Sequence, residues 1–288
     1  MIRSVSRRAL SRLALVLPAA LLAACAPGPQ PAAGGPEPRR LAYGDGDSRF
    51  GELTLPAGEG PVPVVVVVHG GFWRTGYGLE LGRSLALDLA EAGFAAWNVE
   101  YRRVGADGGW TATFDDVAAA VDLLAGPGQD AAAGRLDLTR VVAVGHSAGG
   151  HLAAWLAARP GLPAGAPGAA PAVALRGAVS QAGVLDLVDA AENRVGGTAV
   201  PDLLGGSPAE VPDRYALASP VARAPIGVPV VCVHGDRDAN VPLRQSERFT
   251  AATGDELVVL PGVDHFAVID LGTPAWRACR DAVVRLAG

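Results

Sequence analysis

Five consecutive valines at positions 64–68 constrain the fold of this chain more than any other feature. Their β-branched side chains favour an extended backbone. A run without a polar position is buried on both faces, as are the strands of a parallel sheet that helices cover on both sides. The sequence therefore predicts a central strand over residues 62–68.

The chain from Leu41 onward repeats this pattern, because apolar runs alternate with segments of helical periodicity. Such alternation predicts an α/β fold with a mostly parallel central sheet and helices on both faces. The predicted strands cover residues 52–55, 62–68, 94–99, 140–144, 176–181, 228–233 and 256–260. The predicted helices cover residues 79–92, 114–124, 148–158 and 275–286.

The stretch 183–229 interrupts this alternation. It is long and rich in Gly, Pro and Ala, with only fragments of a helical pattern. Long connections in compact domains often carry function. We therefore predict a small cap inserted over a pocket, with a plain irregular connection as the alternative.

Residues 1–24 are typical of a secretory signal, because four arginines precede an apolar run at 13–24 that ends in small residues. The run is shorter than the roughly 20 residues that cross a bilayer, which disfavours a permanent transmembrane helix. The adjacent Arg7 and Arg8 leave open a twin-arginine export route. The segment predicts an exported protein.

The signal ends in Leu22-Ala23-Ala24-Cys25, which resembles the lipobox of bacterial lipoproteins. The resemblance implies a lipid on Cys25 that anchors the protein to the outer, extracytoplasmic face of a membrane. Residues 26–40 contain five prolines and three glycines among fifteen positions, which predicts a flexible tether after the lipidated cysteine. Residues 41–288 then form one catalytic domain.

Charge and cysteine content restrict the partners. Removing residues 1–24 lowers the formal net charge from −5 to about −9, so phosphate backbones would be repelled and nucleic acid is not an expected partner. Cys232 and Cys279 are the other cysteines, and an exported protein could join them, but the sequence leaves a disulfide open. The histidines show no ligand-like pairing, so we expect no metal and no cofactor.

The nucleophile of a hydrolase is predicted by Gly145-His146-Ser147-Ala148-Gly149, which follows a predicted strand and precedes a predicted helix. This G-x-S-x-G sequence in that context is the nucleophile elbow of the α/β-hydrolase fold. The glycines are needed because side chains there would collide with the neighbouring strand and helix. Ser147 is therefore the expected nucleophile.

A serine hydroxyl needs a base that takes its proton and a carboxylate that orients the base. His265 lies on a loop between the last predicted strand and the last predicted helix, where the base of an α/β-hydrolase belongs. The other histidines lie beside glycines at strand ends or close to Ser147 in the sequence: His69, His146, His151 and His234. We predict His265 as the base.

Two carboxylates follow the preceding strand in the stretch HGDRDANVP. It resembles the H-G-x-x-D-x-x-V-P segment of the superfamily, which implies that Asp238 is the acid and that Asp236 forms a turn. Asp264 is a rival beside His265, although adjacent residues rarely form an orienting pair. The order Ser147, Asp238, His265 is that of the α/β-hydrolase fold.

An oxyanion hole needs amide donors aimed at the reacting oxygen. Ala148 N–H is one candidate. The stretch HGGFW at 69–73 follows the valine strand and resembles an esterase oxyanion loop, which makes Gly71 and Phe72 the candidates for the second donor. The side chains of Trp73, Trp110, His146 and Phe266 are candidates for the pocket lining, with burial in the core as the alternative for the aromatic ones.

Together HGGFW, GHSAGG, HGDRDANVP and DHF resemble the kynurenine formamidase and esterase branch of the α/β-hydrolases, close to the hormone-sensitive-lipase-like enzymes. The resemblance runs from Leu41 to the end and implies a cofactor-free acyl hydrolase that acts on small esters or arylformamides. Two alternatives are an exopeptidase of the prolyl-oligopeptidase type, although no propeller-length segment is present, and a non-catalytic binding lipoprotein, although all three triad residues are present.

Overall fold

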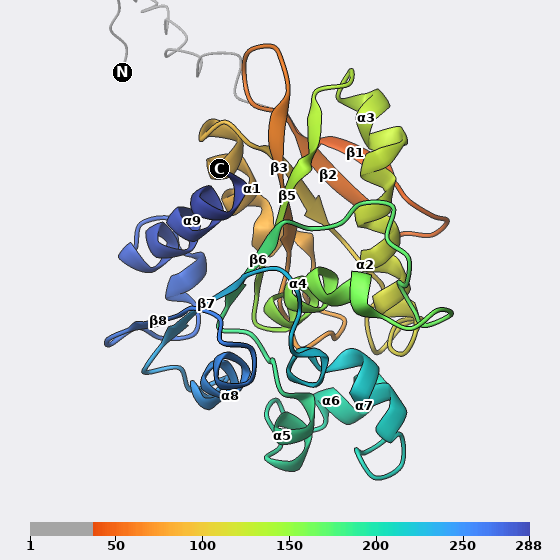
Figure 1. Ribbon diagram of the computed structural model, residues 1–288, viewed down its shortest axis with the longest axis vertical. Helices are drawn as coiled ribbons and strands as arrows, with labels where there is room; N and C mark the ends of the chain where they lie inside the picture. The colour runs from red at the N-terminus through yellow and green to blue at the C-terminus, as the bar shows by residue number, and fades with distance from the viewer. Residues whose placement is uncertain (1–36) are drawn as a thin grey trace, which may run out of the picture. The chain divides into compact units, whose positions relative to one another are not determined.

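The computed structural model describes residues 37–288, and its centre is one sheet of eight strands (Figure 1). Their order across the sheet is β1-β2-β4-β3-β5-β6-β7-β8. β1 and β2 are antiparallel to their neighbours, and all other pairs are parallel. The strands are β1 (Arg39–Ala42), β2 (Phe50–Thr54), β3 (Val62–Val68), β4 (Ala95–Val99), β5 (Leu136–His146), β6 (Gly177–Gln181), β7 (Val230–Gly235) and β8 (Leu257–Leu260).

The valine run forms β3, which lies between β4 and β5 as predicted for a central strand. Its side chains alternate between the two faces: Val64, Val66 and Val68 belong to one buried cluster, while Val65 and Val67 belong to the other. All five are at most 2% exposed. The strand is therefore held by apolar burial on both sides, as its composition requires.

Helices cover both faces of the sheet. α2 and α4 pack in the cluster that contains Val66, and α1 and α9 pack in the cluster that contains Val65. The described helices are α1 (Arg83–Glu91), α2 (Ala112–Asp122), α3 (Pro127–Ala131), α4 (Ala148–Ala158), α5 (Leu187–Glu192), α6 (Ala199–Leu204), α7 (Pro212–Ala218), α8 (Arg244–Thr253) and α9 (Pro274–Ala287). Short 3-10 turns are η1 (Leu79–Gly82), η2 (Leu123–Ala125), η3 (Arg159–Gly161), η4 (Pro220–Arg223) and η5 (Ala267–Ile269).

The predicted insertion at 183–229 contains α5, α6, α7 and η4 between β6 and β7 (Figure 1). It is tied to the rest of the domain by polar contacts. Asp189 and Asp186 accept hydrogen bonds from Arg244 and Arg248 of α8, at 3.0 and 2.7 Å. The insertion therefore is a packed helical segment of the domain.

Three elements differ from the prediction. β1 begins at Arg39, inside the range expected as a tether, and pairs with β2 through backbone hydrogen bonds that its polar sequence does not reveal. α3 was not predicted and has only five residues. α8 was not predicted because Phe249 is its one large buried apolar residue, and it buries polar Gln245 and Ser246 instead.

The two cysteines of this part of the chain are free and buried. Cys232 packs in the cluster on the α4 face of the sheet, and Cys279 packs in the cluster on the α9 face. A sheet therefore separates the two thiols, which answers the question that the sequence left open.

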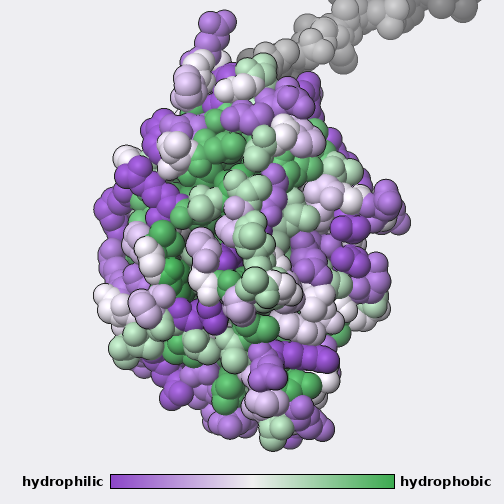
Figure 2. Space-filling model, turned by 45° about the vertical axis from the view of Figure 1, so that its right-hand side comes forward, coloured by the Kyte–Doolittle hydropathy of each residue, from purple (hydrophilic) through white to green (hydrophobic). Residues whose placement is uncertain are grey.

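Signal, lipobox and tether up to residue 36 lie outside the described residues, so Cys25 and its lipid remain predictions. Between residues 37 and 288, no helix is both long and apolar enough to cross a membrane. Figure 2 shows one face of the molecule, on which hydrophilic and hydrophobic residues are mixed.

Candidate active site

Ser147 stands at a sharp turn between the end of β5 and the start of α4. Its backbone has φ 57° and ψ −117°, a conformation that non-glycine residues rarely adopt. Such strain persists only where the surrounding structure enforces it. The turn exposes the side chain of Ser147 to a pocket, although the residue as a whole is 2% exposed.

The glycines around Ser147 are required by close backbone approach. A Cβ atom on Gly149 would collide with the carbonyl oxygen of Val68 in β3, and one on Gly145 would collide with the carbonyl of Gly149. A Cβ on Gly150 would lie 2.9 Å from the Cα of Gly183. The predicted reason for these glycines is confirmed, and it lets the buried helix α4 pack directly against the sheet.

His265 and Asp238 form the expected pair at the same edge of the sheet. Nδ1 of His265 lies 2.6 Å from Oδ2 of Asp238, and His265 is 3% exposed. With the proton on Nδ1 donated to the carboxylate, Nε2 keeps its lone pair and can accept a proton. Ser147 and His265 line the same pocket.

Asp238 is held as a carboxylate by its surroundings. Burial alone would raise its pKa, but hydrogen bonds from the rings of His234 and His265 and from the amide of Val241 outweigh burial and lower the pKa below its usual value. Oδ1 accepts the amides of Asn240 and Val241, both at 2.8 Å. An ionised Asp238 therefore faces His265.

The two rival carboxylates serve turns. Asp264 accepts the amides of Phe266 and Ala267, both at 3.0 Å. Asp236 accepts the amide of Gly262 at 2.6 Å. Neither hydrogen-bonds with the ring of His265 in the described residues, so the geometry favours Asp238 as the orienting acid.

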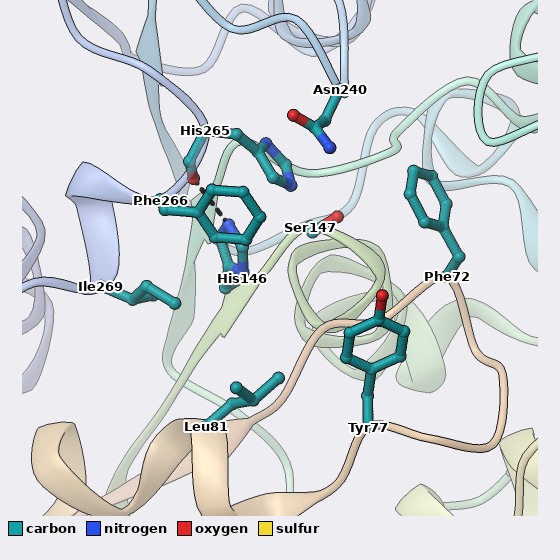
Figure 3. A pocket seen from close by; sticks show the side chains of 10 residues that line it. Phe72, Tyr77, Leu81, His146, Ser147, Asn240, His265, Phe266 and Ile269 are labelled. Carbon is teal, nitrogen blue, oxygen red and sulfur yellow. Dashed lines mark hydrogen bonds between the residues drawn. The ribbon is translucent and has the colours of Figure 1, made fainter.

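The pocket around Ser147 lies between the loop after β3, the elbow and the loops that carry Asn240 and His265 (Figure 3). Its volume of about 90 Å³ is small beside the several hundred Å³ of pockets for drug-sized ligands. Of the predicted lining residues, His146 and Phe266 are confirmed. The Nε2 of His146 lies 2.8 Å from the backbone oxygen of His265.

Two predicted lining residues are corrected. Trp73 is fully buried and donates its Nε1–H to Nδ1 of His151 at 3.2 Å, so it belongs to the core. Trp110 packs edge to face on Phe114 and does not line the pocket either. The surroundings satisfy a buried indole N–H in the first case, which sequence position alone does not show.

The expected cap is also corrected, because no lining residue of this pocket comes from 183–229. The insertion supports the pocket from behind. A Cβ on Gly196 would collide with the ring of Phe72, and Arg74 donates to Asp202 at 2.9 Å. The loop after β3 is thus fixed against the insertion.

The expected oxyanion donors lie beside the nucleophile. A Cβ on Gly70 would lie 3.2 Å from the Cβ of Ser147, so the loop after β3 passes in contact with the elbow. Gly71 and Phe72 have positive φ angles of 113° and 50° and line the pocket. Ala148 begins α4, where amides have no partner within the helix. The arrangement provides donors for an oxygen at Ser147.

A buried carboxylate, Glu100, anchors this loop. Its Oε1 lies 3.0 Å from Nε2 of His69, and its Oε2 accepts the amide of Leu79 at 3.1 Å. The ring of His69 stacks on Tyr101 and contacts the carbonyl of Gly70. Both ends of the segment from His69 to Leu79 are therefore tied to one side chain, which the sequence analysis did not identify.

The sequence analysis also missed four lining residues: Tyr77, Leu81, Asn240 and Ile269. Asn240 is two residues after Asp238 in HGDRDANVP, so its proximity to the site had a sequence signal. The other three come from segments without a motif. Between residues 37 and 288, no group of three or more metal-ligating side chains could hold a metal ion.

The comparison with known families gives one match that covers most of the chain. The BD-FAE family model matches residues 52–253, which include the β3 loop, the nucleophile elbow and Asp238. The chain belongs to the BD-FAE family. A comparison of this BD-FAE protein with curated protein sequences found no match.

Solved structures with the same fold are esterases by their names. A bifunctional GH43-CE protein from Bacteroides eggerthii is 25% identical, with a TM-score of 0.73 over 86% of this BD-FAE chain and 38% of its own. A truncated carbohydrate esterase from gut microbiota is 21% identical, with a TM-score of 0.71 over 86% and 95%. Esterase Est2 from Thermogutta terrifontis is 23% identical, with a TM-score of 0.68 over 87% and 91%.

These findings confirm the α/β-hydrolase fold and identify this BD-FAE protein as an esterase-type hydrolase. The chain spans 38% of the length of the Bacteroides protein, whose other parts have no counterpart here. The kynurenine formamidase branch and the export signal stay predictions.

Proposed function

We propose that this BD-FAE protein is a serine esterase that cleaves small carboxylic esters through an acyl-enzyme. The observation that carries the proposal is the 2.6 Å contact between Asp238 and His265 at a pocket that Ser147 also lines. Ser147 attacks the ester carbonyl while His265 takes its proton. His265 then gives the proton to the leaving alcohol, and water releases the acyl group by the same route.

Charge on the carbonyl oxygen is stabilised by the amides of Ala148 and of Gly71 or Phe72. Each oxyanion donor contributes on the order of 3 kcal/mol to the transition state. The donors are preorganised, because Glu100 and the insertion hold the loop after β3. No cofactor takes part in this mechanism.

The alcohol part of the substrate is proposed to be a sugar or a similar polyol. Two solved structures of the same fold are named as a carbohydrate esterase and as a GH43-CE protein. Exposed aromatic side chains at the pocket mouth, Tyr77 and Phe266, offer faces on which a ring can rest. Arylformamides are the second candidate, supported by the resemblance to kynurenine formamidases.

A fluorophosphonate probe tests the mechanism. The purified protein should be labelled at Ser147, and labelling should be lost in Ser147→Ala and reduced at least a hundredfold in rate in His265→Ala. The Est2 esterase is phosphonylated by sarin, a related reagent. Equal labelling of the wild type and of His265→Ala would contradict the proposal.

Substrate classes are separated by rates on one enzyme preparation. We expect hydrolysis of 4-nitrophenyl acetate and of acetylated sugars, slower hydrolysis of N-formylkynurenine, and none of aminoacyl arylamides, the substrates of the alternative exopeptidase. Faster turnover of N-formylkynurenine than of any ester would replace the first candidate with the second.

The proposed location is the outer face of a bacterial membrane, with a lipid on Cys25 as the anchor and the following residues as a spacer. Replacing Cys25 with alanine should move the esterase from the membrane fraction to the soluble extracytoplasmic fraction. Unchanged fractionation of Cys25→Ala would contradict the anchor.

A further inference from the structure

The pocket at Ser147 ends against a partition of three side chains. Leu81, His146 and Ile269 line this pocket and also line a second, smaller cavity of about 10 Å³ behind it. That volume holds one water molecule at most. The two spaces are thus neighbours that share one wall.

The second cavity is mainly apolar. Its further lining includes Val67, Val68 and Leu85, which belong to β3 and α1. Gln181 is its polar member, and its Oε1 has no hydrogen-bond partner among residues 37–288. A hydrocarbon chain would therefore meet mostly aliphatic surface there.

The chemistry of the proposed esterase assigns a side of the pocket to each part of the ester. The leaving oxygen must face His265, which protonates it, and the carbonyl oxygen must face the amides of Gly71, Phe72 and Ala148. The acyl substituent takes the remaining direction. Figure 3 shows Leu81 and Ile269 on the side of the pocket away from Asn240 and His265.

We infer that Leu81 and Ile269 form the end wall of the acyl subsite and that they set the chain length of the acyl group. With the wall in place, the pocket of about 90 Å³ accepts a short acyl group. Removal of either side chain joins the pocket to the aliphatic cavity behind it and creates room for a longer one. This inference rests on the proposed esterase function.

The test compares 4-nitrophenyl acetate, butyrate, hexanoate and octanoate, which share one leaving group. Wild type should prefer acetate or butyrate. In Leu81→Ala and Ile269→Ala the ratio of kcat/KM for hexanoate to that for acetate should rise by about tenfold or more, because each buried CH₂ contributes about fourfold. Leu81→Phe should lower the same ratio.

Leu87→Ala is the matched control, because Leu87 is an exposed leucine of α1 outside this pocket and should leave the ratio unchanged. Labelling of Ser147 by a fluorophosphonate reports that each variant is folded. Labelled variants with an unchanged chain-length ratio would overturn the inference. A wild type that is neither labelled nor active on any ester would instead overturn the proposed function.

Discussion

His146 and His265 are joined by a hydrogen bond between a side chain and a backbone: Nε2 of His146 lies 2.8 Å from the carbonyl oxygen of His265. The two rings are 4.5 Å apart between centroids. Burial and the neighbouring His265 lower the pKa of His146 to about 3, so its ring is neutral and donates through Nε2–H. The residue before the nucleophile thus holds the loop of the base.

We predict that the protein loses stability between pH 7 and pH 5 because of two buried histidines. Burial lowers the pKa of His146 to about 3 and that of His151 to about 4, below the value near 6.5 of an unfolded chain. The unfolded chain then binds more protons in this pH range, so the free energy of unfolding falls with decreasing pH, by up to about 1.4 kcal/mol per unit for each histidine.

Urea unfolding at pH 7, 6 and 5 measures this slope. His151→Gln, which keeps a polar side chain at the position, should have a smaller slope than wild type. A free energy of unfolding that is equal at pH 7 and pH 5 would rule out the neutral buried state of both rings.

Replacing Asp238 with asparagine should lower kcat for ester hydrolysis by about 10³ to 10⁴ with a small change in KM. An amide cannot fix the tautomer of His265 that leaves Nε2 free, and it does not stabilise the ring once that ring is protonated. Asp264→Asn and Asp236→Asn are matched controls, because their carboxylates accept backbone amides of turns. A loss of kcat in Asp264→Asn as large as in Asp238→Asn would mean that the orienting acid is assigned to the wrong residue.

Glu100→Gln should reduce kcat/KM by about tenfold to a hundredfold while the protein stays folded at room temperature. The hydrogen bonds from His69 and from other donors outweigh burial and lower the pKa of Glu100, so the native group is a carboxylate, and a neutral amide holds the oxyanion loop less firmly. The measurement is steady-state hydrolysis of 4-nitrophenyl acetate beside thermal unfolding.

Asp116→Asn is the control for Glu100→Gln, because Asp116 is also a buried carboxylate and pairs with Arg49 and Arg102 away from the pocket. It should lower the melting temperature with kcat/KM nearly unchanged. Equal losses of kcat/KM in both variants would show that general destabilisation, and not the oxyanion loop, explains the effect of Glu100→Gln.

Cys232 and Cys279 should stay unmodified by iodoacetamide in the native protein and react fully in guanidinium. Burial raises the pKa of both thiols, that of Cys279 to about 12, so little thiolate forms at neutral pH. Mass spectrometry of peptides with and without denaturant measures the modification. A peptide pair joined through Cys232 and Cys279 in non-reduced protein would contradict their positions on opposite faces of the sheet.

Local patterns in the sequence determined the elements around the nucleophile. The valine run gave the central strand with its predicted bounds, and the helix after Ser147 was predicted with its observed bounds, Ala148–Ala158. Apolar periodicity reports burial, and glycine spacing reports close backbone approach. Both are properties of a few neighbouring residues, so they are visible without the fold.

Tertiary structure alone decided which side chains meet. Trp73 follows the oxyanion glycines directly but turns into the core toward His151, whereas Tyr77, Leu81 and Ile269 reach the pocket from segments with no motif. Glu100 anchors the loop after β3 because β3 and β4 end side by side, although 31 positions separate it from His69. The direction of a side chain depends on the space that distant segments leave for it, and that space exists only after the sheet has formed.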